Sequence, residues 1–163
     1  MVSKKLQGAI NDQIRNEYYS SYLYLAMAAW CESVNMPGFA KWLRVQQQEE
    51  WVHGTKFFEF LVDRGATVSL QTLDAPPASY KDMLDLFEHV LEHEQKVTSS
   101  INKLYEIALQ EKDYPAQVLL QWFINEQVEE EKNATLIVEQ IRMVSGKPGA
   151  LIFIDHHVGK REK

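Results

Sequence analysis

Gln48-Glu49-Glu50-Trp51-Val52-His53 is the stretch that decides the fold of this chain. It places Glu50 and His53 three residues apart, so on a helix both side chains lie on one face and can hold one metal ion. The apolar stripe of the segment has helical spacing and passes through both residues: Leu43, Gln46, Glu50, His53, Phe57 and Phe60. The pattern therefore predicts a carboxylate and an imidazole that face the core of a helical bundle.

The composition indicates one folded domain without a cysteine framework. The chain has 163 residues, of which 45% are hydrophobic and 25% charged, and this suffices for a packed core. The formal net charge of −6 argues against binding to nucleic acid or to an anionic membrane. The single cysteine, Cys31, excludes an intrachain disulfide or a cysteine-based metal site. Without a long apolar run or a secretory leader, we expect a soluble cytoplasmic protein.

The periodicity predicts four long helices, over about residues 4–33, 38–64, 79–111 and 114–144, and a short fifth helix over about 148–158. A buried strand is the alternative for the last segment. Ser79, with Asp82 three residues later, is expected to cap the third helix. The connection 66–78 contains Pro76-Pro77 and could reach roughly 45 to 50 Å when extended, which is about the length of the bundle. The fold class is therefore all-α, a four-helix bundle with one long crossover.

Each long helix carries polar residues in its apolar stripe, near its middle. One acid in a stripe is usually a misplaced register, and a lone histidine is usually hydrogen-bonded in the core. Four coincidences at one height instead indicate a site, because the middles of bundled helices meet. Several buried carboxylates repel one another and take up protons unless cations neutralise them, so we predict two divalent ions bridged by Glu50. The residues concerned are Glu17, Glu50, His53, Glu94, Gln127 and Glu130.

Carboxylates with a single imidazole suit iron or manganese, although zinc can compete. A dinuclear iron site of this kind suits the oxidation of Fe(II) by O2 or peroxide. Tyr24 lies two turns beyond Glu17 and could bond a ligand, donate an electron or simply fill the core. Glu49, Glu126 and Glu129 could form a further metal site, although the residues alone favour a solvated acidic face. The other histidines are expected at the surface or at an interface: His89, His93, His156 and His157.

The chain resembles the bacterial non-haem ferritins over essentially its whole length. The motifs that carry the resemblance are Asn16-Glu17-Tyr18-Tyr19-Ser20-Ser21-Tyr22-Leu23-Tyr24, Glu49-Glu50-Trp51-Val52-His53, Glu94 and Asn125-Glu126-Gln127-Val128-Glu129-Glu130. The resemblance implies a single ferritin-like domain over residues 1–163 with a di-iron ferroxidase centre. One iron would be held by Glu17, Glu50 and His53, and the other by Glu50, Glu94 and Glu130.

The resemblance also implies roles for residues around this centre. Gln127 would hydrogen-bond beside it, and Tyr24 would lie close to it. A third iron site would be formed by Glu49, Glu126, Glu129 and Glu130. The subunits would assemble as a hollow homo-oligomer of 24 chains that stores ferric oxyhydroxide.

Sister families fit the sequence less well. Bacterioferritins have a second E-x-x-H on the fourth helix and a haem-binding Met beside the first, whereas this chain has Glu130 and Trp51 there, so no haem is expected. Rubrerythrins need cysteine pairs, and mini-ferritins place a short helix in the crossover, which is proline-rich here. Two alternatives remain: a soluble di-iron oxidase acting on an organic substrate, and a helical interaction protein that binds no iron.

Overall fold

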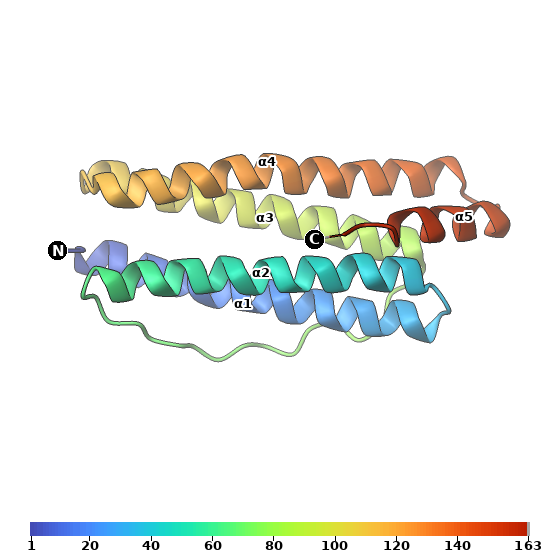
Figure 1. Cartoon of the computed structure of the whole chain (residues 1–163), viewed down its shortest axis with the longest axis horizontal. Helices are drawn as coiled ribbons and strands as arrows, with labels where there is room; N and C mark the ends of the chain where they lie inside the picture. The colour runs from blue at the N-terminus through green and yellow to red at the C-terminus, as the bar shows by residue number, and fades with distance from the viewer. Residues whose placement is uncertain (163) are drawn as a thin grey trace.

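The computed structural model describes residues 1–162, which form one bundle of helices. The helices are α1 (Lys4–Ser33), α2 (Pro37–Asp63), α3 (Met83–Gln110), α4 (Tyr114–Met143) and α5 (Pro148–Val158). α1 and α2 form one antiparallel pair and α3 and α4 the other (Figure 1). The 64–82 connection runs the length of the bundle, so α2 and α3 start at the same end and run parallel (Figure 1). The predicted fold class, including the fifth helix, is confirmed.

Short side chains define where the long helices begin. Ser3 Oγ accepts a hydrogen bond from the amide of Leu6 at 3.1 Å and caps α1. At α3 the cap is Asp82, whose Oδ1 accepts from the amide of Asp85 at 2.9 Å. The carboxylate of Asp85 in turn accepts from the amide of Lys81 at 3.0 Å. The predicted cap at Ser79 is therefore wrong, because these two acids fix the start of the helix one turn later.

The crossover between α2 and α3 is held against α1 by polar contacts. The buried Asn11 donates to the carbonyl of Thr67 at 3.0 Å and accepts from the amide of Ser69 at 2.7 Å. Arg15 donates to the carbonyl of Thr72 and pairs with Asp74, both at 3.1 Å. A segment without helical periodicity thereby obtains backbone partners from α1 and lies in a defined position.

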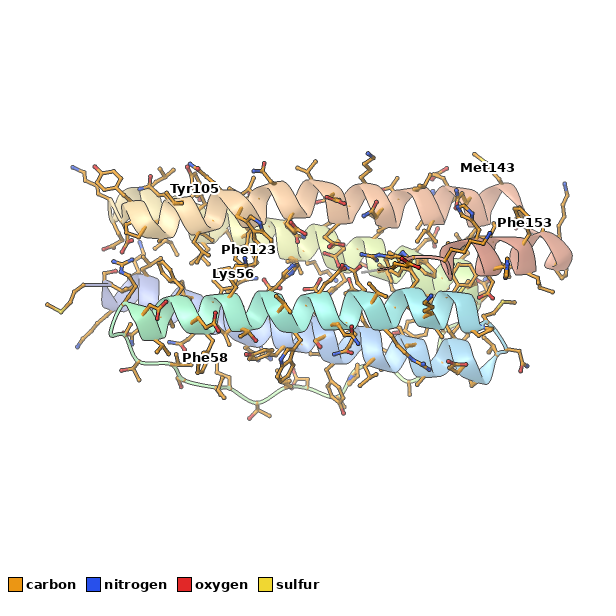
Figure 2. All side chains as sticks on the ribbon, in the orientation of Figure 1. Lys56, Phe58, Tyr105, Phe123, Met143 and Phe153 are labelled. Carbon is orange, nitrogen blue, oxygen red and sulfur yellow. The ribbon has the colours of Figure 1, made fainter. Side chains whose placement is uncertain are left out.

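The hydrophobic core consists of two clusters, one toward each end of the bundle. The first contains Tyr24, Trp42 and Phe87 and lies on the side of α5. The second is built around Phe57 and Phe123, whose rings stack with centroids 4.0 Å apart. Phe123 points from α4 into the space between the two helix pairs (Figure 2). A layer of polar side chains separates the two clusters.

Helical spacing predicts further buried stripes from Ile10 to Ala28 in α1, from Leu84 to Tyr105 in α3 and from Leu120 to Ile141 in α4. The stripes of α1 and α4 are fully buried, whereas that of α3 is partly wrong. α3 packs against both α1 and α4, so its buried face is turned from the predicted one. The residues predicted to be buried but found half-buried are Leu84, Leu91, Thr98 and Tyr105, and those buried in addition are Met83, Leu86, Val90, Val97, Leu104 and Ala108. In α2, Leu61 is buried where Phe60 was expected.

α5 folds back onto the start of α2 through a close backbone contact. A Cβ atom on Gly38 would lie 1.8 Å from the carbonyl oxygen of Asp155, so only glycine allows this approach. The buried carboxylate of Asp155 accepts from the amide of Phe39 at 2.8 Å and so caps α2 from outside the helix. Within residues 1–162, no helix is long and apolar enough to cross a membrane.

Candidate metal centre

A layer of polar side chains lies buried at the middle of the bundle. Each of the four long helices contributes an acid, α2 adds an imidazole and α4 adds an amide. None of these residues is more than 4% exposed. The layer consists of Glu17, Glu50, His53, Glu94, Gln127 and Glu130. The structure therefore places at one level the residues that the sequence placed at mid-helix.

Glu17, Glu50 and His53 form the tightest group in this layer. One ligand atom from each lies within 4.8 Å of the other two. Glu50 Oε2 is 3.5 Å from His53 Nδ1, because the residues are three apart on α2. The imidazole packs edge-on against Trp122 and Phe123 of α4, with centroids 5.5 and 5.6 Å away. These three side chains are thus presented at distances that a single cation can span.

Glu17 has one satisfied and one unsatisfied carboxylate oxygen. Oε1 accepts from the amide of Gln13 at 2.7 Å. Oε2 is buried and has no hydrogen-bond partner. A buried oxygen without a partner is unfavourable, and a cation between Glu17 and the pair on α2 would satisfy it. The unpartnered oxygen of Glu17 therefore fits a position beside a metal ion.

Glu94, on α3, is held in place by two hydrogen-bond donors. The hydroxyl of Tyr24 donates to Glu94 Oε1. The amide of Gln127 donates to Glu94 Oε2 at 3.1 Å and to its backbone carbonyl at 3.2 Å. Tyr24 of α1 and Gln127 of α4 therefore orient the carboxylate of Glu94. Gln127 hydrogen-bonds in the layer, as the resemblance implies.

Gln46 connects two of the acids, a role that sequence reasoning missed. Its Nε2 donates to Glu130 Oε2 at 2.5 Å and lies 3.4 Å from Glu50 Oε1. Gln46 lies one turn before Glu50 in the predicted stripe, and that position was a usable signal. An amide at this point can hold carboxylates from α2 and α4 together, which an apolar side chain could not do.

The pKa values of several acids in the layer are raised by burial and by the charges of their neighbours. Burial raises the pKa of Glu17 well above its ordinary value, and the charge of Glu50 adds to this. Burial likewise raises the pKa of Glu50, followed by the charges of Glu94 and Glu130. The pKa of Glu130 rises to about 7, through burial first and Glu94 second. Divalent cations among these groups would favour the charged carboxylates and reverse the shifts.

The donor set indicates the class of metal. Four carboxylates and one imidazole are mainly hard oxygen donors, which suit iron or manganese better than copper. Each acid reaches the layer from a rigid helix, so the geometry does not depend on a mobile loop. Glu17, Glu50 and His53 together can hold one cation, and Glu94 and Glu130 lie in the same buried layer.

Comparison with known proteins identifies the family. A family model described as a ferritin-like domain matches residues 7–144. This chain belongs to the ferritin-like family. It is 41% identical to the bacterial non-heme ferritin of Bacteroides fragilis (strain 638R), over 99% of this chain and 100% of the relative. It is 37% identical to that of Staphylococcus aureus (strain USA300), over 99% and 97% of the two chains.

A solved ferritin has almost the same fold. The open pore ferritin of the hyperthermophilic archaeon Archaeoglobus fulgidus superposes with a TM-score of 0.98 at 44% identity, over 99% of this chain and 100% of the other. The resemblance to bacterial non-haem ferritins is thus confirmed.

The acids expected at a third site of this ferritin lie beside the centre, but they are not gathered into one cluster. Glu49 is half-buried and bonded to Arg161, and Glu126 shares with it a pocket of about 280 Å³ next to His53. Glu129 is exposed. Among residues 1–162, the metal-ligating group of three is the one containing Glu17. The third site therefore remains a prediction.

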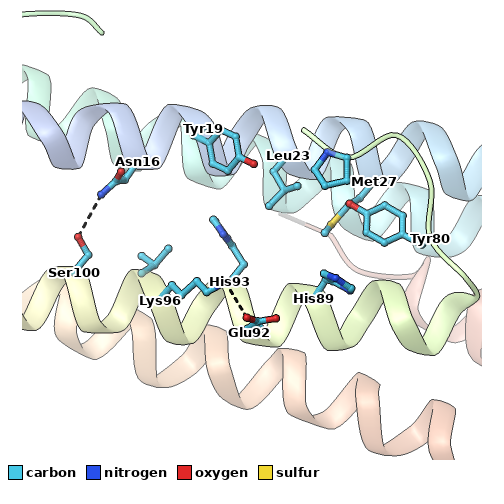
Figure 3. A pocket seen from close by; sticks show the side chains of 12 residues that line it. Asn16, Tyr19, Leu23, Met27, Tyr80, His89, Glu92, His93, Lys96 and Ser100 are labelled. Carbon is cyan, nitrogen blue, oxygen red and sulfur yellow. Dashed lines mark hydrogen bonds and ion pairs between the residues drawn. The ribbon is translucent and has the colours of Figure 1, made fainter. Parts of the chain in front are cut away.

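His93 is not a simple surface residue, contrary to expectation. Its Nε2 lies 2.7 Å from Ser20 Oγ, and its ring packs edge-on against Tyr24 with centroids 5.8 Å apart. It points from α3 toward Tyr19 of α1 (Figure 3). Burial lowers the pKa of His93 to about 4, so its imidazole is neutral at pH 7. This neutral ring packs against Tyr24. The other three histidines are exposed, as expected: His89, His156 and His157.

Proposed function

We propose that this ferritin stores iron and acts as a ferroxidase. Fe(II) would bind in two positions, one at Glu17, Glu50 and His53 and the other at Glu50, Glu94 and Glu130. O2 or peroxide would oxidise it, and ferric oxyhydroxide would be deposited inside a homo-oligomeric cage of 24 subunits. The names of the relatives support this reading, since they are non-heme ferritins.

The observation that carries the proposal is the buried layer with an orphaned acid oxygen. Four acids that meet in the core destabilise the protein unless bound cations neutralise them, and Glu17 Oε2 has no hydrogen-bond partner to compensate for its burial. Cation binding explains both features with the same residues. A layer that only mediated packing would be more stable with apolar side chains.

The residues would act mainly by binding the metal ions and by surrounding them with negatively charged carboxylates. Carboxylate oxygens are hard ligands, so they bind Fe(III) more strongly than Fe(II) and favour oxidation. Glu50 would bridge the two ions, while His53, wedged against Trp122, would fix one of them. Each pair of Fe(II) ions gives up two electrons, which reduce O2 to hydrogen peroxide or peroxide to water. Hydrolysis of the Fe(III) product then yields oxyhydroxide and releases protons.

The decisive experiment is an anaerobic titration of the metal-free protein with Fe(II), followed by oxygen and stopped-flow absorbance. We expect saturation at two or three ions per chain, and fast oxidation in the wild type. Glu50→Ala and Glu130→Ala should lose about a hundredfold or more in initial rate, because loss of a hydrogen-bond partner of a metal ligand already costs about 10–100-fold and these variants remove the ligand itself. Particle size by light scattering should stay that of the assembled cage.

Glu92→Gln is the matched control. Glu92 lies two residues before Glu94 on α3, but it is exposed and pairs with Lys96 at 2.8 Å. Its variant should oxidise iron at the wild-type rate. Unchanged rates in the Glu50 and Glu130 variants would refute the site assignment. A monomer or dimer that still consumes oxygen would instead favour a di-iron oxidase acting on another substrate.

A further inference from the structure

The segment that follows α5 returns to the polar layer. It runs from the end of α5 back toward the middle of the bundle (Figure 1). Arg161, in this segment, lines a groove between α2 and α4 together with Trp42 and Ile137.

The guanidinium of Arg161 has three partners on α2. One nitrogen donates to Glu49 Oε2 at 2.6 Å, and the other donates to Gln46 Oε1 at 2.7 Å. The group also lies over the ring of Trp42, 4.8 Å from its centroid. The side chains of Arg161 and Glu49 are 21% and 34% exposed, so this is a partly buried, geometrically defined contact. A planar guanidinium suits such a fork, whereas a lysine ammonium would not.

These contacts extend into the carboxylate layer. Because Gln46 Oε1 accepts from Arg161, its Nε2 faces the other way and donates to Glu130 Oε2 at 2.5 Å. Arg161 therefore fixes the direction of the amide that binds Glu130. The same guanidinium pairs with Glu49, which precedes Glu50 of the layer in α2.

We propose that in the metal-free form of this ferritin the Arg161 side chain is the counter-ion of Glu49, and that a metal ion binding at Glu49 displaces it. As a positioning residue, it holds Glu49 and Gln46 while the pocket lined by Glu49, Glu126 and Lys56 is free of metal. A cation bound at Glu49 Oε2 would take the place of the guanidinium on that oxygen and repel it from Gln46 Oε1, which would release the tail and free the amide of Gln46. The identity of that cation as iron rests on the proposed function, whereas the competition itself does not.

Calorimetric titration of the metal-free cage with Zn(II), which has no redox chemistry, tests the competition. In the wild type, ions beyond the two at the buried layer should bind weakly. Arg161→Gln should tighten this additional binding about fivefold, because a partly exposed charge pair contributes that order of free energy. Adding Glu49→Gln to Arg161→Gln should abolish the gain. Lys160→Gln is the matched control, since it removes the neighbouring exposed cation and should change little.

Tryptic cleavage of the tail, followed by intact mass, provides the second readout. Zn(II) should accelerate cleavage after Lys160 in the wild type. Glu49→Gln should be cleaved fast without metal, because the tail has lost its anchor. The inference would be overturned if Arg161→Gln and wild type bound the additional Zn(II) with equal affinity. It would also be overturned if Zn(II) did not change the rate of tryptic cleavage. A complete absence of tight Zn(II) binding would instead refute the metal centre itself.

Discussion

Glu130 illustrates, at the scale of one residue, how the layer destabilises the metal-free protein. Its carboxyl group is buried and close to Glu94, and its pKa is raised to about 7. In the unfolded chain the same group titrates near about 4.3. The folded state therefore favours the protonated form, and the stability that protonation brings is present below the unfolded pKa and is lost as the pH rises through the folded one.

We predict that the metal-free protein becomes less stable as the pH rises from about 4.5 to about 7. Glu130 alone should contribute about 3 kcal/mol of this loss, given roughly 1.4 kcal/mol per pKa unit. Glu130→Gln cannot ionise, so it should flatten the pH dependence of the melting temperature in the presence of a chelator. A slope equal to that of the wild type would show that Glu130 titrates normally in the fold.

At the scale of elements, the attachment of α5 depends on the start of α2. Gly38 allows the backbone of α5 to approach, and Asp155 caps α2 through the amide of Phe39. Neither interaction belongs to the four-helix bundle itself. The position of α5, and with it the return of the tail toward the polar layer, thus depends on Gly38 and Asp155 as well as on the packing of Ile154 and Val158 into the core.

Gly38→Ala should therefore displace α5, because the new methyl group would meet backbone that cannot move aside. We expect a loss of about 1–3 kcal/mol in the free energy of unfolding, together with faster proteolysis of the C-terminal segment. Gly8→Ala is the control, since a Cβ atom at Gly8 in α1 would meet nothing within 4 Å. That substitution should stabilise the helix by about 0.5–1 kcal/mol. Similar unfolding curves for the two variants would contradict this account of α5.

At the scale of the whole molecule, the polar layer divides the hydrophobic core into two parts. One part surrounds Phe87 and the other surrounds Phe57 and Phe123, and neither spans the layer. The helices pass through both parts, and at the layer each of them contributes a buried acid in place of an apolar side chain. Cations bound there would link all four helices at the place where apolar packing is interrupted.

Zn(II) should consequently raise the melting temperature of the wild-type cage in a concentration-dependent manner. At a hundredfold excess over the dissociation constant the stabilisation should be about 2.7 kcal/mol per site. Glu50→Gln removes the bridging carboxylate, so its melting temperature should respond much less to Zn(II), while being higher than wild type in chelator. An identical response to Zn(II) in both proteins would mean that the metal acts elsewhere.

Local pattern determined most of the architecture and the identity of the central acids. Helical spacing placed Glu17, Glu50, Glu94 and Glu130 in apolar stripes, and a helix of known length fixes the height of each residue along its axis. The length of the 66–78 connection allowed the crossover to span the bundle. Periodicity could not position the buried face of α3, because that face depends on two neighbouring helices.

Only the tertiary structure decided the contacts between residues distant in the chain. The orphaned oxygen of Glu17, the support of Tyr24 by His93 and the contact of Arg161 with Glu49 all depend on how neighbouring helices and the tail are rotated and placed. No spacing rule relates a residue of α5 or its tail to one on α2, because their separation in space is set by packing and by one glycine. The sequence therefore determined which groups lie in the layer, and the fold decided what satisfies each of them.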